Sequence, residues 1–336
     1  MNNKTKQIYI CAPSGYASGG PEALHQFANE IKYLGYDVKM FYFSHRSDIK
    51  YPRHKNYDIY DIDYIVDESE LKNDIDSCVI VPETACELLL RPYVSNMKKI
   101  VWWLSVDFYF LALKNNNKYF GLKRFLKRES KFPSLDKLKN LKNVIHLPNS
   151  FYTQKFLSDN LMNSIEVVSD YLNFNYTSHS VINKEDIVIY NPAKNGWFLN
   201  QIMNKAPEIK WMPIQNMTQT QVKETMSKAK VYIDFGFHPG RERMPREACL
   251  AKCCLIIGKD GAAKYKEDMP IMDDYHFDAN IDNINQIINK INDCFINYDN
   301  RVKDFANYER NIMDAKSRFN KEVEFFLKSI NLFNTK

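Results

Sequence analysis

The sequence predicts an α/β protein with two doubly wound domains, each built on a parallel β-sheet of the Rossmann type. Two stretches carry this prediction, residues 7–43 and residues 231–258. In each, a short apolar strand is followed by a glycine-containing loop, an amphipathic run at helical spacing and a second apolar strand, which is a βαβ unit. The chain has 336 residues, 45% of them hydrophobic, and is therefore long enough for two domains with full cores.

The first unit starts with a buried strand at residues 7–12 and ends with a strand at residues 38–43. The helix between them is indicated by apolar residues at helical spacing: Leu24, Phe27, Ile31 and Leu34. Its entry loop contains Gly19 and Gly20, and glycines let a ligand approach the backbone and its free N–H groups. A tight turn is the alternative explanation. The loop is no dinucleotide fingerprint, because the third glycine is absent.

Two further strands of the first half end next to a carboxylate. Residues 78–81 lead into Glu83, and residues 100–104 lead into Asp107. A carboxylate at the carboxyl end of a parallel strand is a candidate for a general base or for binding sugar hydroxyls. For Asp107 the alternative role is capping the helix that follows.

Residues 114–142, which begin and end with lysine, are strongly basic. Ten Lys and Arg residues against two acidic ones make a local charge of +8, so the rest of the +5 chain carries −3. Aromatic and leucine side chains are interleaved at roughly helical spacing, as in a helix that lies on an anionic membrane surface. The segment could equally receive an anionic acceptor, and a solvated lysine-rich helix is the plain alternative. A strand at residues 144–147 follows, and Ser150 is expected to cap the next helix.

The second domain is expected to begin after residues 173–186, a polar stretch without apolar periodicity that we interpret as the interdomain linker. Its first strand, residues 187–190, runs into a loop with Asn191 and Lys194. A lysine in this position is suited to clamp a phosphate, because the loop lies at the carboxyl edge of the sheet. A lone surface lysine is the alternative. A further strand and helix occupy residues 211–229.

The loop of the second βαβ unit has the chemistry of a phosphate site. Its residues suited to a phosphate-bearing ligand are His238, Gly240, Arg241, Arg243 and Arg246. Pro245 favours the first turn of a helix that begins near Met244, and a helix start attracts anions. Arginine forks match phosphate geometry, and Glu247, one turn into the helix, can accept hydrogen bonds from ribose hydroxyls. The alternative is a surface helix start whose Arg and Glu side chains pair with each other and are solvated.

Three segments resemble GT-B glycosyltransferases, especially the retaining, glycosyltransferase family 4-like group related to glycogen synthase and to bacterial capsule and lipopolysaccharide transferases. They read SGGPEALHQ at residues 18–26, YNPAKN at residues 190–195 and HPGRERMPREA at residues 238–248. The resemblance implies that Lys194 contacts the donor diphosphate and that Glu247 holds the donor ribose. The group carries another Glu eight residues before Glu247, where this chain has Pro239.

For the whole chain, the resemblance implies a GT-B fold, in which two Rossmann-like domains face a cleft. Residues 1–175 would form the acceptor domain and residues 176–310 the nucleotide-sugar donor domain. Residues 311–336 would form a C-terminal helix that packs back towards the first domain. The loop with Gly19 and Gly20 would face the donor phosphates or the acceptor.

The implied reaction moves a sugar, as hexosyltransferases do, from a nucleotide diphosphosugar to a saccharide or lipid-linked saccharide. Its context would be capsule, lipopolysaccharide or other surface polysaccharide synthesis. Lys194 and Arg243 would stabilise the departing diphosphate, a task that a metal ion performs in other folds, so neither a metal nor another cofactor is expected. Asp107 and Glu83 are the candidate bases if the linkage inverts, and the sequence leaves the stereochemistry open.

Two other classes of function stay open. A nucleotide-sugar epimerase or a polyol-phosphate transferase of the same fold would use the same phosphate clamp. A noncatalytic protein would use the basic segment to contact a membrane surface or nucleic acid. Nucleic acid is disfavoured, because the basicity is confined to one segment and no nucleic-acid-binding motif is recognised.

The composition points to a cytoplasmic protein, either free or peripheral at the inner face of the membrane. No apolar run reaches the length of a membrane span, and the first residues lack a secretory signal pattern. The seven cysteines, an odd number placed mostly in apolar runs, are interpreted as reduced core residues.

Overall fold

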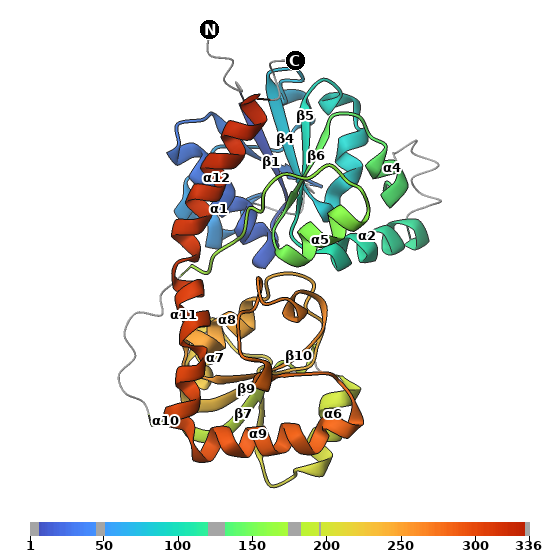
Figure 1. Cartoon of the computed structure of the whole chain (residues 1–336). Coiled ribbons are helices and arrows are strands. Elements are labelled where there is room, and N and C mark those ends of the chain that lie inside the picture. Colours follow the sequence, from blue (N-terminus) through green and yellow to red (C-terminus); the bar gives the residue numbers. More distant parts are fainter. Residues whose placement is uncertain (1–6, 45–50, 120–131, 174–182, 195, 333–336) are drawn as a thin grey trace. The chain divides into compact units, whose positions relative to one another are not determined.

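The computed structural model describes residues 7–44, 51–119, 132–173, 183–194 and 196–332. The chain divides into two compact units: unit 1, Met1–Asp170 with Lys316–Lys336, and unit 2, Tyr171–Ala315. The sequence pattern predicts that the first domain ends at residue 175 and the second at residue 310. Each unit is a parallel sheet with helices between successive strands (Figure 1), so the prediction of two α/β domains is confirmed.

Unit 1 contains a six-stranded parallel sheet in the order β3-β2-β1-β4-β5-β6. Its strands are β1 (Gln7–Pro13), β2 (Val38–Phe43), β3 (Tyr64–Ile65), β4 (Ser77–Pro82), β5 (Lys98–Trp103) and β6 (Val144–Pro148). The order changes direction at β1, where Ile8 pairs with Val38 of β2 on one side and with Cys78 of β4 on the other. In open α/β sheets, ligands bind at such a switch point, outside the carboxyl ends of the strands.

The helices of unit 1 follow the strands. They are α1 (Gly19–Tyr33), η1 (Lys55–Tyr60), η2 (Glu68–Glu70), η3 (Glu83–Leu90), η4 (Pro92–Val94), α2 (Val106–Tyr119), α4 (Leu135–Lys139) and α5 (Phe151–Asp159). α1 buries Leu24, Phe27 and Ile31, as their spacing predicts. The expected cap of α5 is confirmed, because Ser150 Oγ accepts the N–H of Thr153 at 3.1 Å.

The last helix of the chain, α12 (Ala315–Leu332), packs on unit 1 (Figure 1). The rings of Phe319 and Phe326 contact the ring of Phe27 in α1, with centroid distances of 6.3 and 5.3 Å. All three rings are fully buried, so the helix completes the core of this unit. The expected return of the C-terminal helix to the first domain is confirmed.

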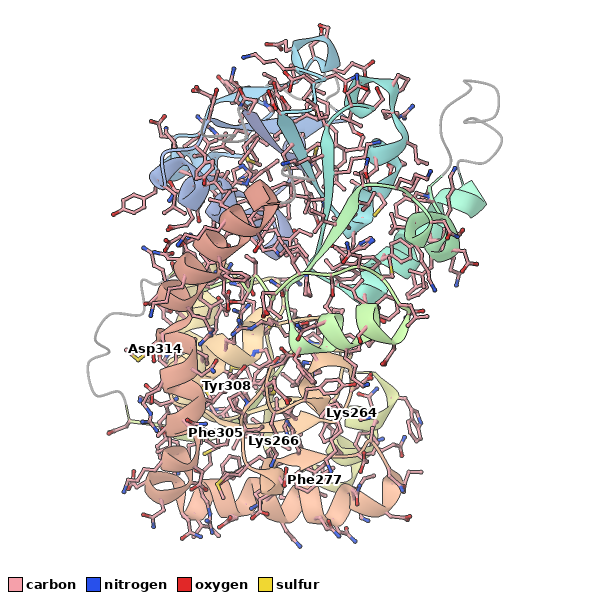
Figure 2. The ribbon with its side chains drawn as sticks, turned by 45° about the horizontal axis from the view of Figure 1, so that its top comes forward. Lys264, Lys266, Phe277, Phe305, Tyr308 and Asp314 are labelled. Atoms are coloured by element: carbon pink, nitrogen blue, oxygen red, sulfur yellow. The ribbon has the colours of Figure 1, made fainter. Side chains whose placement is uncertain are left out.

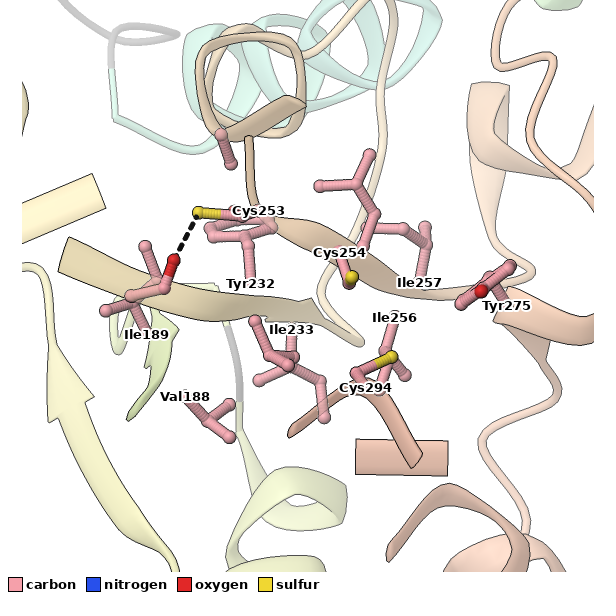
Figure 3. Close-up of a cluster of buried hydrophobic side chains, with 14 of the residues drawn as sticks. Val188, Ile189, Tyr232, Ile233, Cys253, Cys254, Ile256, Ile257, Tyr275 and Cys294 are labelled. Atoms are coloured by element: carbon pink, nitrogen blue, oxygen red, sulfur yellow. Dashed lines mark hydrogen bonds between the residues drawn. The ribbon is translucent and has the colours of Figure 1, made fainter. Parts of the chain in front are cut away.

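Unit 2 contains a five-stranded sheet in the order β11-β10-β9-β7-β8. Its strands are β7 (Glu185–Tyr190), β8 (Lys210–Pro213), β9 (Ala229–Asp234), β10 (Cys254–Gly258) and β11 (His276–Phe277). Every residue of β10 is buried, because the central strands of a parallel sheet are covered on both faces. Figure 3 shows the resulting apolar centre, in which Val188 and Ile189 of β7 lie with Ile233 of β9 and Ile256 of β10.

The helices of unit 2 surround this sheet. They are α6 (Trp197–Lys205), α7 (Gln219–Lys228), α8 (Arg243–Leu250), α9 (Ile284–Ile296), α10 (Tyr298–Arg301) and α11 (Ala306–Met313), with short helices η5 (Gly261–Lys264), η6 (Asp273–Tyr275), η7 (Ile281–Asn283) and η8 (Val302–Phe305). α9 buries Ile284, Ile287 and Ile291, in agreement with their helical spacing. Phe305 and Tyr308, labelled in Figure 2, are buried in the same core.

All seven cysteines are free and buried, so the expectation that they are core residues is confirmed. Cys253 is an example: its thiol donates to the carbonyls of Met226 and Ala229 at 3.2 and 3.3 Å, within the core drawn in Figure 3. Burial raises the pKa of this thiol above its ordinary value and keeps it protonated.

Two predicted surface features lie partly outside the described residues. These are the linker, of which residues 174–182 are outside, and the basic segment, of which residues 120–131 are outside. The described parts of the basic segment belong to α2 and α4 and to the chain around them. Among the helices that the structure describes, none has the length and apolar content needed to cross a bilayer.

Candidate functional site

The loop between β9 and α8 is organised by Asp234, the last residue of the strand. Its buried carboxylate accepts the N–H of Gly236 on Oδ1 and the hydroxyl of Tyr232 on Oδ2, both at 2.8 Å. The bond to Gly236 turns the chain immediately after the strand. α8 then begins at Arg243, one residue before the predicted start, with Pro245 in its first turn.

Gly236 lets this loop touch the loop after β7. A Cβ at Gly236 would lie 2.6 Å from Lys194 Cβ and 2.7 Å from Lys194 O, which is closer than side chains tolerate. Across this contact, Lys194 Nζ donates to the carbonyl of Phe237 at 3.1 Å and forms an ion pair with the carboxylate of Glu242. Two loops that are far apart in the sequence therefore meet at the carboxyl edge of the sheet.

Asn191 connects the same two loops. Its Oδ1 accepts the N–H of Ala193 at 3.0 Å, and its Nδ2 donates to the sulfur of Met244 in α8 at 3.3 Å. The first bond shapes the turn that leads to Lys194, and the second ties this turn to the start of α8. Asn191 therefore positions Lys194.

The arginines of the loop have different surroundings. Arg246 is buried, and its guanidinium donates to the carbonyls of Glu242 and Arg241 at 3.0 and 2.7 Å. Arg243 is more exposed, and its Nε donates to Glu247 Oε1 at 2.6 Å, one helical turn away. Arg246 thus holds the backbone of the loop, whereas Arg243 presents its charge at the start of α8 together with the carboxylate of Glu247.

His238 belongs to the loop between β9 and α8, and its ring is fully buried. Nε2 is 3.8 Å from Asp234 Oδ1, and neither ring nitrogen has a hydrogen-bond partner among the described residues. Burial lowers the pKa of His238, although Asp234 opposes the shift, so the ring is neutral at pH 7. The carbonyl of His238 accepts the N–H of Ala262 at 2.8 Å. Gly261 has a φ of +52°, and a Cβ there would lie 2.0 Å from this carbonyl oxygen.

In unit 1, the glycine loop after β1 is held by Tyr57 of η1. The Tyr57 hydroxyl accepts the N–H of Ser18 at 3.0 Å and donates to the carbonyl of Ser18 at 3.1 Å. The ring of Tyr57 stacks on His25 of α1 at 4.1 Å, and burial lowers the pKa of His25 to about 4. A Cβ at Gly19 would meet nothing within 4 Å, so there is open space at this turn.

Glu83 follows β4, the strand next to β1 at the switch point. Its carboxyl is buried, and Oε2 accepts the N–H of Leu104 at 2.9 Å. Burial raises the pKa of Glu83 to about 8, against the opposing effect of the backbone N–H groups. The neutral acid is therefore the main form at pH 7. These surroundings favour a role in holding the chain after β5 over the role of a base.

Asp107 lies in the first turn of α2, where Ser105 is the capping residue. Ser105 Oγ accepts the N–H of Phe108 at 3.0 Å, so the alternative role considered for Asp107, capping, belongs to Ser105. Asp107 Oδ2 instead accepts the hydroxyl of Tyr152 at 3.3 Å, and its side chain is partly exposed. Of the two candidate bases, Asp107 is the accessible one.

The predicted site residues thus form two groups, each at the carboxyl edge of one sheet. Unit 1 contributes Gly19, Gly20, Glu83 and Asp107, and unit 2 contributes Asn191, Lys194, His238, Gly240, Arg241, Arg243, Arg246 and Glu247.

Sequence reasoning missed three residues of the unit 2 loops. Glu242 pairs with Lys194, and the signal for it was its position between two arginines. Trp197 is the first residue of α6, just after the Lys194 loop, and Phe237 lies in the loop after β9; 60% and 39% of their surfaces are exposed. Exposed aromatic rings beside a cationic loop are candidates for stacking on a ligand.

Comparison with solved structures identifies the fold of this chain. No protein-family model matches the sequence, and no curated protein matches it. Among solved structures, HepE of Anabaena in complex with UDP-glucose is similar over 96% of this chain and 99% of that chain, with a TM-score of 0.65 and 10% identity. The pneumococcal O-GlcNAc transferase GtfA, in complex with UDP and GlcNAc, is similar over 99% of this chain and 100% of that chain, with a TM-score of 0.60 and 11% identity.

A third structure is WaaG, a glycosyltransferase involved in lipopolysaccharide biosynthesis. It is similar over 94% of this chain and 99% of that chain, with a TM-score of 0.56 and 10% identity. At such low identities the similarity establishes the fold and not the substrate. The chain has the two-domain GT-B fold of glycosyltransferases.

Proposed function

We propose that the protein is a glycosyltransferase that moves a sugar from a nucleotide diphosphosugar to a saccharide acceptor. The observation that carries the proposal is the contact between the loop of Lys194 and the loop that leads to Arg243, at the carboxyl edge of the unit 2 sheet. Lys194 reaches Glu242, the N-cap residue of α8, and Arg243 begins that helix, where backbone N–H groups also attract anions. Such an arrangement suits a diphosphate.

In the proposed reaction, the bond between the anomeric carbon and the diphosphate oxygen breaks while the acceptor oxygen bonds to that carbon. Negative charge develops on the leaving diphosphate. Lys194 and Arg243 stabilise this charge electrostatically without a metal ion, because both groups are held in place before the reaction. In this proposal Glu247, one turn into α8, accepts hydrogen bonds from the hydroxyls of the donor ribose.

The acceptor hydroxyl must also lose its proton. Asp107 is the better candidate for a base, since Glu83 is buried and mainly neutral at pH 7. If the product retains the anomeric configuration, the departing phosphate oxygen takes the proton instead. Product configuration, read by NMR, decides between these routes.

We further infer that the acceptor belongs to surface polysaccharide synthesis, such as capsule or lipopolysaccharide, and is carried near an anionic membrane surface. The support is chemical. α2 exposes Phe108, Phe110 and Leu111, and the chain from Lys114 onwards carries the local charge of +8. Exposed apolar side chains followed by many cations suit an anionic lipid surface or a lipid-linked anionic acceptor.

The first experiment is thermal unfolding with UDP, GDP, CDP, CMP, dTDP or ADP. A nucleotide at a hundred times its Kd adds about 2.7 kcal/mol to the stability of the unit that binds it, a shift of a few degrees. Lys194→Ala should reduce the shift strongly but leave measurable binding, and Lys210→Ala should preserve the full shift. Lys210 pairs with Glu185 at the start of β8, the end of the strand opposite the carboxyl edge. The corresponding nucleotide sugars are then assayed for transfer, and mass spectrometry separates transfer from epimerisation. No shift and no turnover with any of them would reject the proposal.

A further inference from the structure

We propose that Glu242 acts as an internal substitute for the donor phosphate: its carboxylate pairs with Lys194 in the free protein and is exchanged for a phosphate oxygen when the donor binds. Glu242 would then lower the affinity of the site for the donor phosphate. This inference rests on the proposed function, because it concerns the same phosphate site.

The first observation is the pairing itself. The side chains of Lys194 and Glu242 are 26% and 19% exposed, so the pair is accessible at the edge of the loop and not sealed in the core. Lys194 Nζ is also fixed by the carbonyl of Phe237 at 3.1 Å. Because an ammonium group has three donors, this second bond keeps Nζ in the loop when the carboxylate leaves.

The second observation is the position of Glu242 in the chain. It is the N-cap residue of α8, yet its side chain makes no capping bond to the first N–H groups of the helix. A capping side chain normally accepts such a bond. The Glu242 carboxylate instead turns to Lys194 and brings a negative charge beside the helix start, the place that suits a phosphate.

The third observation is that the other cation has a carboxylate as well. Arg243 pairs with Glu247 within α8, while Lys194 pairs with Glu242 across the two loops. The first pair connects neighbouring turns of one helix, so a ligand can bind to Arg243 while this pair stays intact. The second pair occupies a cation from another loop, so a phosphate that binds Lys194 competes with Glu242 for the same ammonium group.

The exchange has a consequence for affinity. A partly exposed ion pair changes an equilibrium constant by only about two- to fivefold, so a multiply charged diphosphate displaces the carboxylate readily. Binding of each anion that takes the place of Glu242 is weakened by the same factor. Glu242 would therefore lower the affinity of the site a little and leave its order of preference among anions unchanged.

The test is calorimetric titration of the full chain with inorganic pyrophosphate and with UDP. We expect Glu242→Gln to bind pyrophosphate about two- to fivefold more tightly than the native protein, because Lys194 is released from its internal partner. In the Lys194→Ala background, Glu242→Gln should leave the affinity unchanged. This coupling separates competition for Lys194 from a general effect of charge.

The matched control is Glu309→Gln, which removes a carboxylate paired with Lys252 in the same unit, outside the phosphate site. It should not change the affinity. The inference is overturned if Glu242→Gln binds pyrophosphate as the native protein does or more weakly. If Lys194→Ala still binds it more weakly than the native protein, the proposed function stands. Failure of the native protein to bind pyrophosphate, UDP or any other nucleotide would overturn both.

Discussion

Gly236 and Lys194 approach so closely that a Cβ on the glycine would lie 2.6 Å from the lysine Cβ. This contact brings the two cationic loops of unit 2 together, and it depends on the missing side chain. Gly236→Ala should therefore push the loops apart, lower the free energy of unfolding by about 1–3 kcal/mol and weaken nucleotide binding. Chemical denaturation and calorimetric titration measure the two effects.

Gly196→Ala is the control for this prediction. Gly196 stands beside the same loop, but a Cβ there would meet nothing within 4 Å, and its φ of −95° and ψ of −131° lie outside the regions that other residues favour. Gly196→Ala should therefore cost backbone strain alone and bind nucleotide as the native protein does. Equal effects of the two substitutions would show that the close contact is not what matters.

Arg243 and Arg246 should behave differently, although both belong to the start of α8. Arg246→Ala removes the guanidinium that donates to the carbonyls of Arg241 and Glu242. It should therefore lower the free energy of unfolding by about 1–3 kcal/mol. Arg243→Ala should change stability little and lower kcat about a hundredfold or more, because it removes charge opposite the leaving group. Denaturation and initial-rate kinetics separate the two roles. A normal kcat for Arg243→Ala would remove it from the proposed mechanism.

Glu83 should make the stability of unit 1 depend on pH. Its pKa in the folded protein is about 8, above the unfolded value of about 4.3, so the folded state binds the proton more tightly. The stabilisation is fully present below about pH 4 and is lost as the pH rises through 8, with a slope of up to about 1.4 kcal/mol per pH unit. Glu83→Gln should lack this decline in denaturation curves between pH 5 and 8.

Glu68→Gln serves as the control for this titration, since Glu68 is an exposed carboxylate of the same unit. Its curves should follow those of the native protein. If Glu83→Gln shows the same decline as the native protein, Glu83 does not titrate in this range.

Trp197 should report nucleotide binding through its fluorescence. Trp102 and Trp103 are fully buried in unit 1, whereas 60% of Trp197 is exposed beside the Lys194 loop. Stacking of a nucleobase or sugar on this ring should quench its emission. Trp197→Phe should remove most of the quenching and keep measurable binding. Quenching that persists in this variant would come from another tryptophan, such as Trp211 of β8, and would show that the ligand does not stack on Trp197.

The exposed apolar face of α2 should promote binding to anionic vesicles. Phe108→Ser with Leu111→Ser should weaken binding to phosphatidylglycerol vesicles several-fold, because each side chain is half exposed and inserts easily. Phe325→Ser is the control, because Phe325 is 51% exposed on α12 of the same unit. Vesicle sedimentation at low and high salt measures the effect. Equal binding by all variants would exclude α2 as the contact.

The sequence by itself determined the architecture and the sheet edges at which the candidate site residues stand. Apolar strands, helical spacing and the glycine-containing loops are local patterns, so the two βαβ units were predictable from short stretches of chain. The cations of residues 238–248 were visible for the same reason. In a parallel α/β sheet the loops after the strands share one edge, so Lys194 and Arg243 could be assigned to the same edge without coordinates.

Only the tertiary structure decided what each charged side chain does. Arg246 looks like Arg243 in the sequence, but it is buried and bonded to carbonyls. Glu83 and Asp107 both follow strands, yet only Asp107 remains partly exposed. The pairing of Lys194 with Glu242 could not be predicted from the sequence either. Burial and pairing depend on contacts between residues that are distant in the chain. Such contacts cannot be predicted from a local sequence pattern.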